Sequence, residues 1–156
     1  MIENITILNS KERKHFLEIL NKLYGIEELP NFTYFYIKEK ERLYVVNKEI
    51  FNFDLNEIKT NSTGLYIGTF MLDGFRFSVE GSQIFSKLIN KNILEITKEQ
   101  RNAWIKGEDL ETDEFEGEYV VLKCENDFLA SAKVKNNIIK NFIPKARKQK
   151  KVFGEE

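Results

Sequence analysis

The sequence has few of the residues that carry most enzyme chemistry. Among 156 residues there is one cysteine and one histidine. A single cysteine cannot form an internal disulfide, so nothing in the chain requires an oxidising compartment. Cys124 lies in the apolar run 119–124, which predicts a strand residue rather than a reactive thiol. His15 has no second histidine or cysteine near it in the sequence, which predicts a surface or interface position rather than a metal ligand or a catalytic base.

Long apolar runs and nucleotide-binding motifs are also missing. No stretch approaches the length that spans a bilayer and the first residues lack the pattern of a signal peptide, so we expect a cytoplasmic protein. No phosphate-binding GxxxxGK[ST] motif occurs, and Gly64 and Gly68 surround a predicted strand instead of joining a strand to a helix. The acids of 108–118 lack the spacing and the central glycine of a calcium loop. We therefore expect no cofactor, no metal and no catalytic activity.

What the sequence does have is a segregated distribution of charge. The net charge is only −1, yet residues 108–118 hold seven acids and no base. Residues 133–151 hold eight lysines or arginines and no acid. A basic surface on a folded domain attracts phosphates, so nucleic acid is the first partner that the sequence indicates.

The first ninety residues predict two helices with several β-strands between them. Asn9 and Glu12 form a capping-box pattern before apolar residues at helical spacing, and Gly25 can end that helix. The β-rich runs 32–37 and 43–46 predict a hairpin, and 65–70 and 75–77 predict two more strands, while 50–55 is ambiguous. Ser78 predicts the N-cap of a second helix that extends through 88–89, in which Gly81 indicates a close packing contact.

The remaining residues predict a small β-barrel of about 60 residues. A strand over 93–96 precedes a helix over 98–106, which Thr97 and Gln100 would cap and Gly107 would stop. Strands over 118–123, 128–135 and 138–142 follow, and the predicted turns between them are 126–127 and 136–137. The fold class is therefore α+β, with a domain boundary near residue 90.

An ordered set of segments in this second part resembles a PUA domain, the RNA-binding module named after pseudouridine synthases and archaeosine transglycosylases. The segments are NILEIT, WIKGEDLE, GEYVVL, FLASAKV and KNNIIKNFIPKAR. They are similar to the C-terminal regions of Sun-family rRNA cytosine methyltransferases and to PUA domains of archaeal sulfotransfer-like enzymes. The resemblance implies a small α/β N-terminal domain over 1–90 and a PUA-like β-barrel domain over 91–153. Large-subunit ribosome-biogenesis factors share this layout, and no methyltransferase cofactor segment is present.

The sequence departs from the family at one place. Ala130, Ser131 and Ala132 stand where the family often has glycines, so we expect a less close approach of the backbone to a ligand there. In the family the helix, the helix-to-strand connection and the last strand contact RNA. The acidic stretch 108–118 would then lie beside the binding surface and would repel phosphate.

The candidate RNA contacts follow from the charge pattern and from the resemblance. Lysine and arginine side chains are expected on phosphates. Asparagines of the turn 136–137 and of the last strand could read base edges or ribose hydroxyls, although turn formation also accounts for the first two. Trp104 has the means to stack on a base, but its apolar neighbours favour a core position. The predicted contacts are Lys135, Asn136, Lys140, Asn141, Lys145, Arg147, Lys148, Arg101 and Gly107, with Arg76 as a further candidate and Asn137 beside Asn136 in the turn.

The function that these features predict is non-catalytic RNA binding. The chain would recognise structured rRNA or tRNA in ribosome biogenesis or RNA modification. One alternative is a subunit that supplies RNA binding to a separate modifying enzyme. Another is a protein-interaction module, in which the aromatic hairpin 32–46 would contact a partner protein and RNA binding would be absent.

Overall fold

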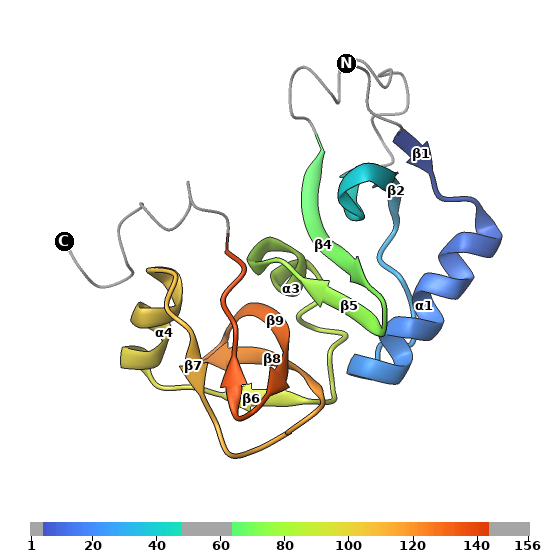
Figure 1. The fold of residues 1–156 in the computed structure, drawn as a ribbon. Coiled ribbons are helices and arrows are strands. Elements are labelled where there is room, and N and C mark those ends of the chain that lie inside the picture. Colours follow the sequence, from blue (N-terminus) through green and yellow to red (C-terminus); the bar gives the residue numbers. More distant parts are fainter. Residues whose placement is uncertain (1–4, 48–63, 144–156) are drawn as a thin grey trace.

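The computed structural model describes residues 5–47 and 64–143, which form two sheets with helices around them (Figure 1). The fold class is α+β, as the sequence predicts. The N-terminal sheet has the order β1-β2-β3-β4-β5, and all its neighbouring strands are antiparallel. Its strands are β1 (Ile5–Ile7), β2 (Phe32–Ile37), β3 (Arg42–Asn47), β4 (Leu65–Met71) and β5 (Gly74–Phe77).

Helix α1 (Ser10–Tyr24) packs on this sheet through one apolar stripe. Phe16, Leu20 and Tyr24 are spaced four residues apart and are all buried. The helix begins where the sequence predicts, because the Asn9 side chain accepts a hydrogen bond from the Glu12 amide and the Glu12 carboxylate accepts one from the Asn9 amide. It ends at Gly25, whose φ of 71° lies in the left-handed region.

The C-terminal sheet has the order β6-β8-β9-β10-β7 and curls into a half-barrel. Strand β6 pairs with β8 in parallel, and the other pairs are antiparallel. Helix α4 (Lys98–Ile105) has the predicted capping box of Thr97 and Gln100. The strands are β6 (Ile93–Glu95), β7 (Leu110–Glu111), β8 (Tyr119–Cys124), β9 (Asp127–Lys135) and β10 (Ile138–Ile139).

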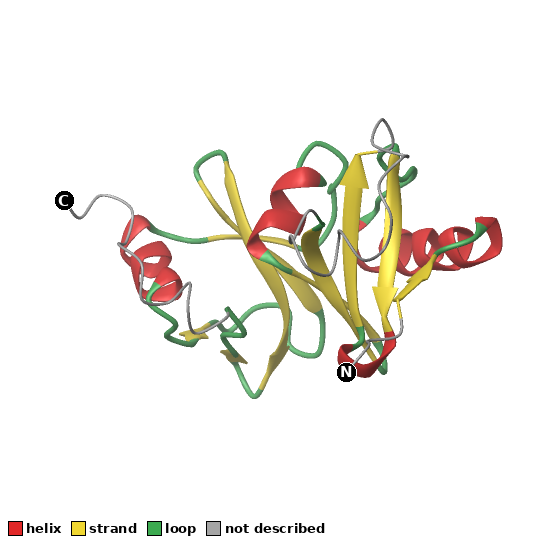
Figure 2. Ribbon diagram, turned by 90° about the horizontal axis from the view of Figure 1, so that it is seen from above, coloured by secondary structure: helices red, strands yellow, loops and turns green. Residues whose placement is uncertain are grey.

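Helix α3 (Val79–Ile84) lies between the two sheets (Figure 2) and packs against β4 and β9. The Ser78 side chain caps it, as predicted, by accepting a hydrogen bond from the Gly81 amide. The close contact predicted at Gly81 is present, because a Cβ there would overlap the carbonyl group of Ile67. The helix is shorter than predicted, since residues 85–88 form turns rather than a continuation.

A continuous apolar cluster joins the N-terminal sheet to the C-terminal one. Tyr119, Val121 and Phe128 pack in the same cluster as α1 and the inner face of the N-terminal sheet. A second cluster fills the half-barrel and contains Trp104, which is buried as the sequence predicts. It also contains Cys124, which is buried at the end of β8 and is a strand residue as predicted. His15 is exposed on α1, also as predicted, and Tyr34 lies in the core.

Two further local predictions are wrong. The β8–β9 turn is at 125–126 instead of 126–127, and Glu125 takes the positive φ of 57°. The last strand covers only Ile138–Ile139 instead of 138–142. The strands β1 and β7 were not predicted, because each has no more than three residues and shows no period. The ambiguous segment 50–55 lies outside the described residues. No helix in the described part of the chain is long and apolar enough to cross a bilayer.

Candidate nucleic-acid interface

The two predicted turn asparagines connect β9 to β10. Asn136 and Asn137 have φ values of 54° and 63°, which asparagine adopts more readily than most residues. The Glu116 carboxylate accepts hydrogen bonds from both of their amides, each at 2.8 Å. These two bonds hold the pKa of Glu116 below its ordinary value. One member of the acidic stretch therefore fixes the turn of the basic strand pair.

Asn141 is buried, which corrects its predicted role as an RNA contact. Its side-chain nitrogen, Nδ2, donates hydrogen bonds to the carbonyl oxygens of Trp104 and Glu108, at 2.7 and 3.1 Å. Its side-chain oxygen accepts a hydrogen bond from the backbone amide of Ile143. The backbone amide of Asn141 donates a hydrogen bond to the Asp109 carboxylate. The side chain is 7% exposed, so it is not available to a base edge. It instead ties the residues after β10 to the end of α4.

A groove of about 420 Å³ opens between the N-terminal sheet and the half-barrel. The β4–β5 turn and β5 contribute Met71, Asp73 and Arg76. The half-barrel contributes the other walls. The charged side chains around the groove are four basic residues and one acidic residue. The lining residues from the half-barrel are Tyr119, Lys133, Lys135, Ile138, Lys140 and Phe142.

Asp73, the acid of the groove, connects the two domains. One of its carboxylate oxygens accepts a 2.6 Å hydrogen bond from the Tyr119 hydroxyl, and the other pairs with the Lys133 ammonium. The bond from Lys133, followed by that from Tyr119, lowers the pKa of Asp73 below its ordinary value of 3.8. Burial, followed by the bond to Asp73, raises the pKa of Tyr119 far above that of a free phenol. At neutral pH the carboxylate is therefore ionised and the phenol is protonated.

Arg76 and Phe142 stack across the same groove. The guanidinium carbon of Arg76 lies 3.7 Å from the centre of the Phe142 ring, the distance of a direct face-on contact. The Phe142 side chain nevertheless remains 47% exposed. Met71 and Ile138 are also partly exposed beside it, at 37% and 38%. The groove thus combines open apolar surface with positive charge.

Lys135 and Lys140 are the predicted phosphate contacts that line the groove. Both are exposed, and neither has an ion pair with another described residue. Lys133 differs from them, because Asp73 already neutralises it. Positive charge available to a ligand therefore comes from Lys135, Lys140 and Arg76. Asn136 lies in the adjoining turn and is exposed.

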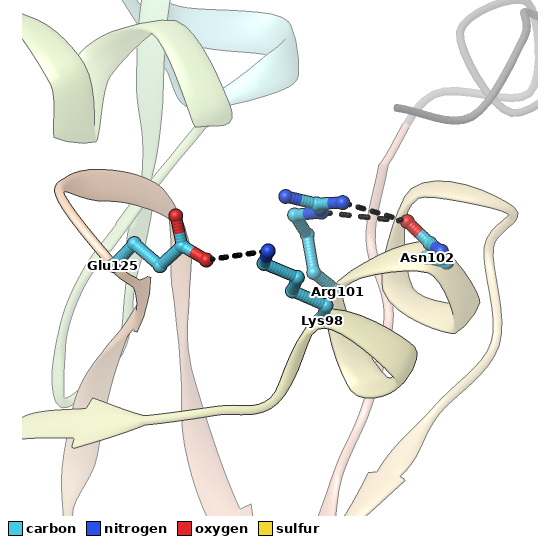
Figure 3. Close-up of polar contacts among 4 residues, drawn as sticks. All are labelled: Lys98, Arg101, Asn102 and Glu125. Atoms are coloured by element: carbon cyan, nitrogen blue, oxygen red, sulfur yellow. Dashed lines mark hydrogen bonds and ion pairs between the residues drawn. The ribbon is translucent and has the colours of Figure 1, made fainter. Parts of the chain in front are cut away.

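Arg101 and Gly107 lie outside the groove, on α4 and just after it. Arg101 donates to the side-chain oxygen of its neighbour Asn102 at 3.2 and 3.4 Å (Figure 3). Beside it Lys98 pairs with Glu125 at 3.1 Å, which joins the start of α4 to the β8–β9 turn. Gly107 has a φ of 101°, a conformation that favours glycine, and it ends the helix as predicted. Lys145, Arg147 and Lys148 lie outside the described residues.

The segment that departs from the family's glycines is placed between the two domains. Ala130 has a φ of 84°, and its amide donates to the Ser82 hydroxyl on α3. The Ser131 hydroxyl accepts a bond from the Phe77 amide and shares one with the Tyr24 hydroxyl. Ser131 is 1% exposed. This stretch therefore attaches the half-barrel to the N-terminal domain and is closed to a ligand.

The fold defines the class of this protein: an α+β domain followed by a PUA-like half-barrel. Residues 91–148 match the family model described as the methyltransferase RsmF PUA domain. Residues 6–79 match the model described as the NIP7/UPF0113 pre-PUA domain. The chain therefore has a pre-PUA domain followed by a PUA domain, the two-domain layout that the resemblance implied. No curated protein matches the chain.

The two matches also indicate the general function. PUA domains bind RNA, and the combination with a NIP7-like domain indicates an RNA-binding family related to ribosome biogenesis and RNA modification. Both matched modules are RNA-binding modules rather than catalytic domains, although the RsmF PUA domain belongs to a methyltransferase.

Proposed function

We propose that this protein is a non-catalytic, cytoplasmic RNA-binding protein that recognises structured rRNA or tRNA through its C-terminal PUA-like domain. The observation that carries the proposal is the pair Lys135 and Lys140. Both are exposed, both line one groove, and neither has an acid against it among the described residues. Ammonium groups without an acidic partner attract phosphate at the lowest desolvation cost. We keep Lys145, Arg147 and Lys148 in the proposal as further phosphate contacts.

The salt dependence of binding tests this proposal. The purified full chain is titrated into labelled tRNA and rRNA fragments at about 50 and 200 mM salt, and binding is followed by fluorescence anisotropy. Contact with five phosphates gives a slope of about −3.5 to −4.5 in log affinity against log salt, which is a roughly 10²- to 10³-fold loss over this range. The double variant K135A/K140A should make the slope shallower by about 1.4–1.8. No RNA binding at either salt concentration would refute the proposal.

A matched control is available on α1. Lys11 and Lys14 are exposed and have no ion pair among the described residues. They lie at the opposite end of the helix from Leu23, which packs near the β4–β5 turn. The helical rise places Lys11 about 18 Å along the axis from Leu23. The variant K11A/K14A removes the same charge and should leave the slope unchanged. An equal effect of both double variants would show that net charge, and not this surface, governs binding.

A second candidate function is supported by the match to a methyltransferase's PUA domain. In that case the chain supplies RNA binding to a separate modifying enzyme. Affinity purification of the full chain under mild salt distinguishes the two, because a stable complex with a methyltransferase or a pseudouridine synthase favours the subunit role.

A further inference from the structure

The groove between the two domains has the features of a site for one nucleotide. Its volume of about 420 Å³ falls within the range of small-ligand sites in proteins. It has an open apolar platform at Phe142, a guanidinium plane at Arg76 and the ammonium groups of Lys135 and Lys140, which no acid of the described residues pairs with. These groups bind the base and the phosphates of a single-stranded nucleotide, since bases stack on aromatic rings and on arginine planes while lysines hold phosphates.

We propose that this groove holds one unpaired nucleotide of the bound RNA, with its base stacked against the Arg76–Phe142 pair and its flanking phosphates on Lys135 and Lys140. This inference rests on the proposed function and specifies what the site takes. The ligand is a base extruded from a loop or a bulge, because the bases of a duplex present their faces only to each other. Paired RNA would reach the lysines but would leave the platform empty.

The mixed charge of the groove favours a nucleotide over a bare phosphate. The Asp73 carboxylate lies among the basic side chains of the groove, and its contacts with Lys133 and Tyr119 keep it ionised. It repels an anion beside it and keeps Lys133 occupied, so phosphates are directed toward Lys135 and Lys140. The region beside Asp73 suits the uncharged base, whose amino groups can donate to a carboxylate.

The site requires both domains, which gives the N-terminal domain a role in binding. Arg76 and Asp73 come from the β4–β5 region, and Phe142, Lys135 and Lys140 come from the half-barrel. The contacts of Asp73 with Tyr119 and Lys133 fix the distance between the two walls. The PUA domain alone would provide phosphate contacts without the arginine half of the platform.

The experiment compares two RNAs of equal length with the full chain. One is a hairpin that carries 2-aminopurine in its loop, and the other is a continuous duplex. The wild-type protein should bind the hairpin more tightly and should quench the 2-aminopurine fluorescence, because stacking quenches it. The variants F142L and R76K should each weaken binding to the hairpin by about tenfold or more and abolish the quenching. Neither should change binding to the duplex, since R76K keeps the charge and F142L removes none.

Three controls separate the possible results. F142Y keeps the aromatic face and should retain both affinity and quenching, while K11A/K14A should behave as wild type. Trp104 fluorescence confirms that each variant is folded, and Phe142 is exposed enough for leucine to be accommodated. Equal affinity of the wild type for hairpin and duplex, or full quenching by F142L, would refute the nucleotide site while leaving RNA binding by the chain intact. A wild-type protein that binds neither RNA would refute the proposed function itself.

Discussion

Asp73 has a structural role that an acidic residue in a basic groove would not suggest. Its carboxylate is stabilised in the groove because the Lys133 ammonium and the Tyr119 hydroxyl both donate to it. Its pKa is lowered in the folded state, so the stability it contributes is fully present above its ordinary value of 3.8 and is lost as the pH falls below that value.

The first prediction concerns this network. Asp73→Asn should lower the free energy of unfolding by about 1 kcal/mol at neutral pH, a small amount because solvent screens a carboxylate that is 51% exposed. The difference in stability between wild type and variant should shrink as the pH falls below the ordinary carboxyl value of 3.8, because the wild-type carboxyl group then loses its charge. Urea unfolding at a series of pH values measures it. Asp127→Asn is the control, because Asp127 is exposed and forms no ion pair with another described residue. If the difference in the free energy of unfolding between wild type and Asp73→Asn stayed constant with pH, the ionised Asp73 carboxylate would not be the group that stabilises the fold.

The second prediction concerns Asn141. Asn141→Ala should lower the free energy of unfolding by about 2–3 kcal/mol, because it leaves the carbonyl groups at the end of α4 and the Ile143 amide without their partners in a buried place. Trp104 fluorescence in urea reports the change. Asn136→Gly replaces an exposed asparagine at a positive φ and should change stability by no more than about 0.5 kcal/mol. Equal effects of the two variants would mean that the buried bonds contribute little.

The charge run of the sequence singles out Lys135 and Lys140, which line the groove, but it does not indicate the other residues of the groove. Asp73 meets Lys133 and Tyr119, which follow it by 60 and 46 residues. No local pattern indicates such pairs, because they depend on how the domains pack. Asn141 was misassigned for the same reason. Its neighbours Lys140 and Phe142 are exposed, and only the contact with α4 shows that it points inward.

At the scale of elements, local signals were reliable wherever a cap or a period was present. The capping boxes at Asn9 and Thr97 mark the starts of α1 and α4, and Ser78 marks the start of α3. The end of α3 and the extent of β10 could not be predicted, since the chain there follows its packing against neighbours instead of its propensity. The acidic stretch 108–118 also has structural roles, because Glu116 and Asp109 accept backbone hydrogen bonds from residues of the basic run: Asn136, Asn137 and Asn141.

The third prediction concerns the contact between α3 and β4. Alanine is a better helix former than glycine by about 1 kcal/mol, so Gly81→Ala would stabilise an isolated helix. In this protein the new methyl group would overlap the Ile67 carbonyl, and the variant should instead lose about 2–3 kcal/mol. Gly117→Ala, where an added Cβ meets nothing within 4 Å but φ is 84°, should lose only about 1 kcal/mol. Thermal and urea unfolding measure the stability of both variants. If Gly81→Ala were as stable as the wild type, the close packing of Gly81 against Ile67 would be contradicted.

For the molecule as a whole, we propose the domain boundary near residue 90, yet the two parts share an interior. Tyr119 and Phe128 of the half-barrel pack in the cluster that α1 covers. Ser131 bonds to Phe77 and Tyr24 of the N-terminal domain within the same interface. Burial raises the pKa of Tyr24 far above its ordinary value, so its hydroxyl stays protonated and donates to the Phe75 carbonyl. An interface with this much apolar and polar contact opposes independent motion of the domains.

The final prediction follows from that shared interior. Leu20→Ala, at a fully buried position of α1, should remove about 3 kcal/mol from the N-terminal domain. Because the domains are joined through one cluster, unfolding should stay a single transition, and Trp104 in the other domain should report the same shift in urea midpoint as far-UV circular dichroism. Lys14→Ala, on the exposed face of α1, should leave both midpoints unchanged. If the Trp104 transition kept its wild-type midpoint in Leu20→Ala, the domains would unfold independently. A groove built from both would then lose its fixed walls whenever the N-terminal domain opened.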